Sequence, residues 1–84
     1  MVPKQLILYA KPGCAWCRIA ENYLQEHGYT YLLVDVISDR SAFAEMKRLS
    51  GQTYAPTLAV GDLILPDFGP EELEEFLQQH QILP

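Results

Sequence analysis

A short apolar segment, residues 5–10, leads directly into the sequence Lys11-Pro-Gly-Cys-Ala-Trp-Cys17, and a helical pattern follows. This junction constrains the fold because it places both sulfurs at the first turn of a helix, beside the end of a strand. Backbone N–H groups without partners and the positive end of the helix dipole stabilise a thiolate at that position. Cys14 and Cys17 are the only cysteines in the chain. A Cys-x-x-Cys pair in this setting indicates thiol–disulfide exchange.

Strand and helix patterns alternate along the rest of the chain. β-rich apolar runs predict strands at residues 5–10, 29–36, 57–60 and 63–65. Helical spacing and terminal signals predict helices from about Cys14 to His27, from Ser38 or Asp39 to Ser50, and from Gly69-Pro70 to about His80. Gly28 and Gly51 are expected to end the first two helices.

This order of elements defines a topology. A helix joins the first two strands, so these strands are expected to be parallel, with a right-handed crossover. The last two strands are joined by Gly61-Asp62 and are expected to form a hairpin beside them. We therefore predict an α/β domain over residues 1–84, with a four-stranded mixed sheet and three helices in the order βαβαββα.

Length and charge exclude several classes of protein. Eighty-four residues suffice for one small core, and a net charge of −5 argues against a nucleic-acid partner. No apolar run reaches the roughly 20 residues that cross a bilayer, and the first residues lack a secretory signal. We expect a monomer in the cytoplasm, without a membrane partner. A dithiol there is more often catalytic than structural.

The motif Lys11-x-x-Cys14-x-x-Cys17, followed by Tyr54-Ala-Pro56 before the hairpin, resembles the glutaredoxin family over nearly the whole chain. The resemblance implies the thioredoxin fold in its minimal glutaredoxin form and a cis bond before Pro56. It also implies a dithiol–disulfide oxidoreductase that acts in cell redox homeostasis and electron transport. Its substrates would be protein disulfides or glutathione mixed disulfides.

A narrower resemblance concerns the C-terminal part of the chain. Pro56-Thr-Leu-Ala-Val-Gly-Asp-Leu63 and Phe68-Gly-Pro70 are similar to the glutaredoxin-like redoxins that supply electrons to ribonucleotide reductase. Thioredoxin reductase, rather than glutathione, reduces those proteins. Phe68 is expected to pack as a hydrophobic staple on the last helix, with a reductase-docking role as the alternative.

The candidate site residues have distinct expected roles. Cys14 is predicted to attack the substrate disulfide, and Cys17 to resolve the mixed disulfide that forms. Lys11 is expected to stabilise the thiolate or to bind a substrate carboxylate. Trp16 offers a flat surface for a substrate. By the family resemblance, Tyr54, Ala55 and Pro56 border the substrate groove, where a backbone edge at Ala55 pairs with an extended peptide.

Two metal-binding alternatives exist for the cysteine pair. A zinc site would need two further ligands, and only His27 and His80 remain, both predicted at helix ends. We therefore predict no metal site. Some glutaredoxins without proline after the first cysteine hold a [2Fe–2S] cluster between two subunits, with glutathione as a ligand. Ala15 stands at that position and permits this alternative.

Glutathione recognition is where the chain departs from the family pattern. Thr53 and Tyr54 replace a basic residue and a threonine that are common there. The Gly-Gly pair that holds the γ-glutamyl end is absent, Pro70 cannot donate an N–H, and Glu71 and Glu72 would repel a carboxylate. We predict no bound cofactor and a weak affinity for glutathione as reductant. Thioredoxin reductase is the alternative electron donor.

Overall fold

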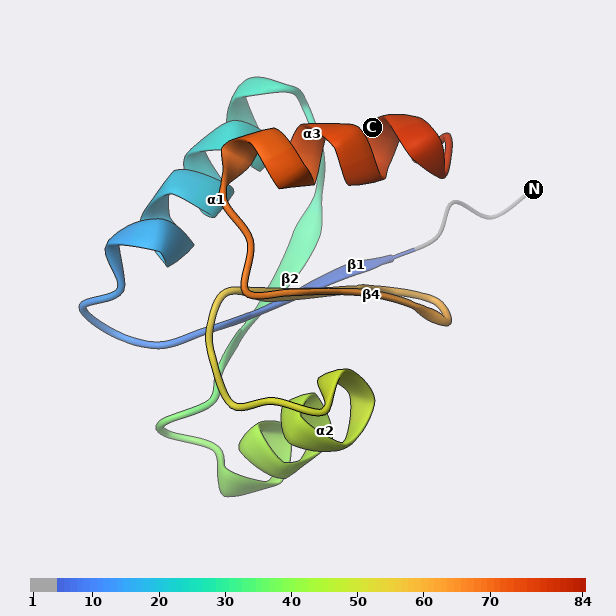
Figure 1. The fold of residues 1–84 in the computed structure, drawn as a ribbon. Helices are drawn as coiled ribbons and strands as arrows, with labels where there is room; N and C mark the ends of the chain where they lie inside the picture. The colour runs from blue at the N-terminus through green and yellow to red at the C-terminus, as the bar shows by residue number, and fades with distance from the viewer. Residues whose placement is uncertain (1–4) are drawn as a thin grey trace.

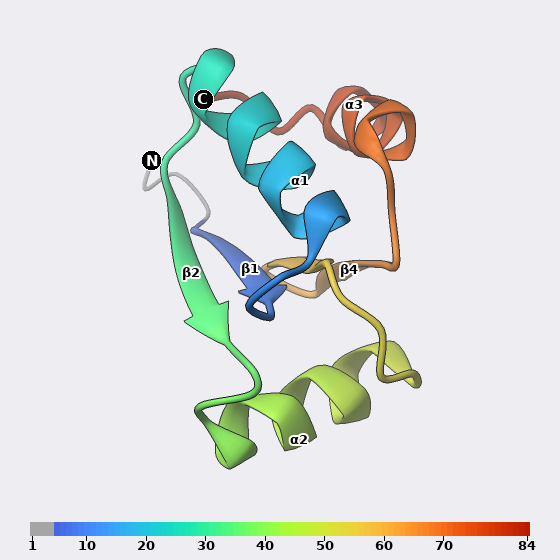
Figure 2. The ribbon, with the colours of Figure 1, turned by 90° about the vertical axis from the view of Figure 1, so that its left-hand side faces the viewer.

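The computed structural model describes residues 5–84, which form one mixed sheet between two layers of helices (Figures 1 and 2). The strands are β1 (Leu6–Ala10), β2 (Tyr31–Asp35), β3 (Thr57–Val60) and β4 (Leu63–Pro66). The helices are α1 (Ala15–Glu26), α2 (Arg40–Ser50) and α3 (Pro70–Gln79). The strand order is β2-β1-β3-β4, with β1 and β2 parallel and the other pairs antiparallel. The predicted topology is confirmed.

The sheet separates two apolar clusters. Helices α1 and α3 cover one face and α2 covers the other, as Figure 2 shows. The α1–α3 side holds the larger cluster, which includes Leu8, Leu24, Leu58 and Leu73, all completely buried. The α2 side holds a smaller cluster around Met46. Burial on both faces explains why the central strands β1 and β3 consist almost entirely of apolar residues.

Helix α1 begins and ends at the expected positions. Cys14 is its N-cap, with extended backbone angles, and His27 is its C-cap. Gly28 follows with φ of +79°, a conformation that glycine adopts without steric cost. The N–H of Tyr29 then bonds to the carbonyl of Leu24 at 2.8 Å and closes the helix end.

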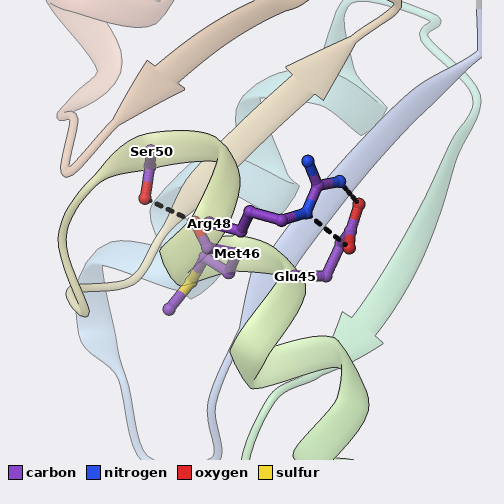
Figure 3. A network of polar contacts seen from close by, with 4 residues as sticks. All are labelled: Glu45, Met46, Arg48 and Ser50. Atoms are coloured by element: carbon purple, nitrogen blue, oxygen red, sulfur yellow. Dashed lines mark hydrogen bonds and ion pairs between the residues drawn. The ribbon is translucent and has the colours of Figure 1, made fainter.

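Helix α2 is held by contacts within its own sequence. Asp39 is the N-cap and accepts a hydrogen bond from the N–H of Ala42, so the alternative cap Ser38 is excluded. Gly51 ends the helix in the left-handed conformation, as expected. In the last two turns, the hydroxyl of Ser50 donates to the carbonyl of Met46 at 2.6 Å, and Arg48 pairs with Glu45 on the exposed side (Figure 3).

The second strand is shorter than predicted. The sequence pattern indicated residues 29–36, whereas β2 covers only Tyr31–Asp35. The N–H of Tyr29 is used by the end of α1, and its hydroxyl donates to the carbonyl of Ile82 at 2.6 Å. At the other end, Val36 lies beyond the strand although its N–H still bonds to Ala10. The prediction was too long because residues 29, 30 and 36 continue the β-rich pattern without pairing as part of the strand.

Phe68 lies in the segment that connects the hairpin to α3. Its side chain is only 3% exposed and belongs to the large apolar cluster. This burial favours the staple interpretation. Pro70 occupies the first helical position of α3, as predicted. None of the helices described for residues 5–84 is both long and apolar enough to cross a membrane.

Candidate active site

Cys14 and Cys17 meet at the start of α1, next to the end of β1. Their sulfur atoms are 2.50 Å apart, near disulfide distance, and their Cα atoms are separated by 5.2 Å. Cys14 is half-buried at the N-cap, whereas Cys17 is 3% exposed and lies in the first turn. The N–H of Cys17 donates to Sγ of Cys14 at 3.2 Å. The helix start thus presents one accessible sulfur, supports it with a backbone N–H, and holds the second sulfur behind it.

The loop before β3 brings a backbone carbonyl to the accessible sulfur. Sγ of Cys14 lies 3.9 Å from the carbonyl oxygen of Ala55, although 41 positions separate these residues. The Ala55–Pro56 peptide bond is cis, as the resemblance implied. Pro56 itself is completely buried, so its ring offers no contact surface to a substrate. The exposed edge at this point is the backbone of Ala55 and the side chain of Tyr54, which is 63% exposed.

Two polar residues that the sequence did not single out hold this loop. Thr57 is completely buried, and its hydroxyl donates to the carbonyl of Tyr54 at 2.9 Å. The amide of Gln52 donates to the same hydroxyl at 3.0 Å and accepts from the N–H of Tyr54. The sequence signal that could have identified Thr57 is its position directly after a proline and before an apolar run. Its importance follows from burial, because a buried hydroxyl needs partners.

A groove of about 320 Å³ opens on one side of the cysteine pair. Besides the two sulfurs, it is bordered by side chains of both charges: Lys11, Arg18, Glu21 and Asp35. The Asp35 carboxylate accepts from the N–H of Ile37 and from Ser38, and these hydrogen bonds hold the pKa of Asp35 below its usual value. This groove therefore combines cations and anions within one surface.

Lys11 is exposed, borders this groove and lies in the loop between β1 and α1 that precedes Cys14. We predict that Lys11→Ala raises the pKa of the Cys14 thiol, because the variant lacks a cation that favours the thiolate. The change should be well under one unit, because solvent screens an exposed charge. A titration of thiolate absorbance against pH measures this. Lys47→Ala removes another exposed lysine, from α2, and should leave the titration unchanged. Equal curves for both variants would show that Lys11 does not act on the thiolate.

Trp16 is 58% exposed and borders a different groove on the α3 side of the site. The structure therefore gathers Cys14, Cys17 and Ala55 closely, while Lys11 and Trp16 border separate grooves. His27 and His80 cap the C-terminal ends of α1 and α3. His27 is about 15–20 Å along the helix from the two cysteines, at 1.5 Å per residue, which is too far for it to share a metal ion with them.

Comparison with known proteins places the chain in a family. The model of the family described as Glutaredoxin matches residues 6–64, which include the dithiol, the Ala55–Pro56 bond and most of the hairpin. The chain belongs to the glutaredoxin family. A glutaredoxin-like 8.6 kDa protein in the rubredoxin operon of Clostridium pasteurianum is 26% identical over 86% of this chain and 96% of its own.

Solved structures agree on the fold. A glutaredoxin from Archaeoglobus fulgidus superposes with a TM-score of 0.79 at 16% identity, covering 89% of this chain and 87% of its own. The glutaredoxin-like NrdH-redoxin from Escherichia coli gives 0.72 at 22% identity, covering 84% and 92%. The glutaredoxin family consists of thiol–disulfide oxidoreductases, and this member has the cysteine pair of the family near disulfide distance. The predicted thioredoxin fold is confirmed.

Proposed function

We propose that this glutaredoxin-family protein reduces disulfides through Cys14 and Cys17. The observation that carries the proposal is the difference between the two sulfurs. Cys14 is accessible and receives the N–H of Cys17, whereas Cys17 is buried one turn into α1. A sulfur at a helix N-cap that accepts a backbone N–H is stabilised as the thiolate, which is the nucleophilic form. The accessible residue therefore attacks, and the buried one resolves.

The reaction transfers two electrons in two exchange steps. The Cys14 thiolate attacks one sulfur of the substrate disulfide and forms a mixed disulfide, and the other substrate sulfur leaves as a thiolate that takes a proton from solvent. Cys17 then loses its proton and attacks Sγ of Cys14. This breaks the mixed disulfide, releases the second substrate thiolate and leaves the Cys14–Cys17 disulfide. Ala55 and Tyr54 offer the adjacent backbone edge to an extended substrate peptide.

A second candidate concerns the electron donor that reduces this disulfide. The N–H of Gly69, at the start of α3, donates to the Glu72 carboxylate at 2.7 Å, and Pro70 has no N–H. A glutathione carboxylate placed there would lose these donors and meet the charge of Glu72. Each missing charge-assisted hydrogen bond costs about 1.5–3 kcal/mol. We infer that thioredoxin reductase is the better donor and that the protein acts as a redoxin, with ribonucleotide reductase as an acceptor.

The same geometry bears on cluster carriage. A [2Fe–2S] cluster that used glutathione as a ligand would need a glutathione site, and at the start of α3, where the family resemblance puts its γ-glutamyl end, the Gly69 N–H is already bonded to Glu72. Visible absorbance after anaerobic purification tests this alternative directly. Cytoplasmic location, a monomeric state and the absence of a resident cofactor remain predictions from the sequence.

A reduction race tests the donor. We expect the oxidised protein to draw electrons from NADPH through thioredoxin reductase at least about tenfold faster than from glutathione with glutathione reductase. NADPH oxidation followed at 340 nm, with a model disulfide as acceptor, measures both rates. The Cys14→Ser variant supplies the background for each reductase. Fast, saturable turnover with glutathione would contradict the donor assignment, and no turnover with either donor or with dithiothreitol would contradict the proposed oxidoreductase function.

A further inference from the structure

A second groove, of about 360 Å³, lies between α1 and the start of α3. It is bordered by Trp16, Asp67, Phe68, Gly69, Pro70, Glu71 and Glu72. We call it the α3 groove. A Cβ added at Gly69 would stand 3.3 Å from the Trp16 ring, so the indole rests against this stretch of backbone. Since more than half of the Trp16 surface is exposed, the indole forms an open aromatic wall of the groove.

The charge of the α3 groove has a single sign. Its ionisable side chains are the carboxylates of Asp67, Glu71 and Glu72, and all three are exposed. Within residues 5–84, the carboxylates of Asp67 and Glu71 take part in no hydrogen bond or ion pair. By contrast, the groove on the other side of the dithiol includes Lys11 and Arg18. An aromatic face beside unpaired carboxylates is complementary to a cation, which gains from both.

The α3 groove is connected to the reactive sulfur. The N–H of Asp67 donates to the carbonyl of Pro56 at 2.9 Å, and the carbonyl of the preceding residue, Ala55, lies 3.9 Å from Sγ of Cys14. The α3 groove therefore lies within reach of groups that flank a substrate sulfur bound at Cys14. Trp16, two residues after Cys14, borders the same path.

The start of a helix ordinarily attracts anions through its free N–H groups. At α3 this attraction is weakened from within, because Glu72 accepts the N–H of Gly69 and Pro70 has none to offer. The carboxylates of Asp67 and Glu71 then decide the sign of the groove.

We propose that the α3 groove binds a positively charged group next to the substrate disulfide, such as a lysine or arginine side chain of a protein substrate. The inference rests on the proposed oxidoreductase function and names the substrate class of that same site. Disulfides with cationic neighbours are then reduced faster than neutral ones, and anionic disulfides such as oxidised glutathione are reduced more slowly. The Trp16 face and the unpaired carboxylates of Asp67 and Glu71 produce this preference for cationic over anionic disulfides.

Three small disulfides of similar size test the proposal. The reduced protein is mixed with cystamine, bis(2-hydroxyethyl) disulfide or 3,3′-dithiodipropionate, which carry ammonium, hydroxyl and carboxylate groups. Stopped-flow Trp16 fluorescence, or quenching of the reaction with a thiol-blocking reagent at set times, gives each rate constant. Each value is divided by the rate constant of dithiothreitol with the same disulfide, which corrects for the reactivity of the disulfide itself. We expect a corrected ratio of cationic to anionic substrate of about tenfold at low ionic strength, decreasing with salt.

Matched variants separate the groove from the overall negative charge. Asp67→Asn/Glu71→Gln removes two charges from the groove, and asparagine tolerates the positive φ of 47° at position 67. Glu74→Gln/Glu75→Gln removes two charges from α3 outside the groove. The Asp67→Asn/Glu71→Gln variant should reduce the corrected ratio of cationic to anionic substrate to about two- or threefold. The Glu74→Gln/Glu75→Gln variant should keep most of the wild-type ratio. Trp16→Ala, followed by thiol quenching, should lower the cystamine rate alone.

The outcomes are unambiguous. Equal corrected rates for the three disulfides, or equal losses in the two double variants, would overturn the inference. Reduction of the neutral disulfide at an appreciable rate would in either case leave the proposed oxidoreductase function intact. Failure with all three substrates would instead contradict that function.

Discussion

Replacing Cys14 with serine is expected to lower disulfide reduction to the rate measured without protein. A serine hydroxyl is not ionised near neutral pH, and only the thiolate attacks a disulfide. Cys17 cannot substitute for it, because its side chain is 3% exposed and lies behind Cys14. Dithiothreitol-driven reduction of a protein disulfide measures the loss. Reduction that persists in Cys14→Ser would contradict the assigned roles.

The complementary variant, Cys17→Ser, should accumulate a covalent adduct with substrate. Attack by Cys14 still forms the mixed disulfide, but the sulfur that resolves it is missing. Mass spectrometry without reductant should show protein plus one substrate half, and dithiothreitol should release it. The Cys14→Ser/Cys17→Ser double variant should show no adduct. In the reduced wild-type protein, iodoacetamide should label Cys14 first, because its pKa is expected below the reference value of about 8.5.

The largest expected effect on stability comes from the interior of α1. Leu24 is completely buried in the larger apolar cluster, which lies between the sheet and the two helices α1 and α3. Leu24→Ala should lower the free energy of unfolding by about 2–5 kcal/mol, since it removes buried apolar surface and leaves a cavity. A domain of this length has a total of roughly 4–13 kcal/mol at 0.05–0.15 kcal/mol per residue. The loss is therefore a large fraction of the total.

Urea denaturation followed by circular dichroism measures this change from the shift of the midpoint. Leu83→Ala is the matched control, because the same atoms are removed from a side chain that is 79% exposed. Its effect should stay within about 0.5 kcal/mol. Similar midpoints for the two variants would show that the cluster around Leu24 does not hold α1 to the sheet.

Features that depend on a few neighbouring residues were predictable from the sequence. The Asp39 cap, the left-handed Gly51 and the first-turn Pro70 are set by bonds or steric limits within one or two helical turns. The strand-to-helix junction placed Cys14 and Cys17 at the start of α1 by the same local logic. Their spacing of three residues brings the sulfurs together without help from the rest of the chain.

Contacts between distant segments were decided only by the tertiary structure. The approach of Ala55 to Cys14, the wall that Trp16 forms against Gly69, and the bond between Pro56 and Asp67 join residues far apart in the sequence. The sequence pattern identifies such residues but not their distances, because those depend on how the helices pack on the sheet. Element order and cysteine spacing therefore determined the fold and the dithiol, whereas packing created the two grooves. Packing also brought charges from separate elements together beside the dithiol and set Trp16 against the acidic start of α3.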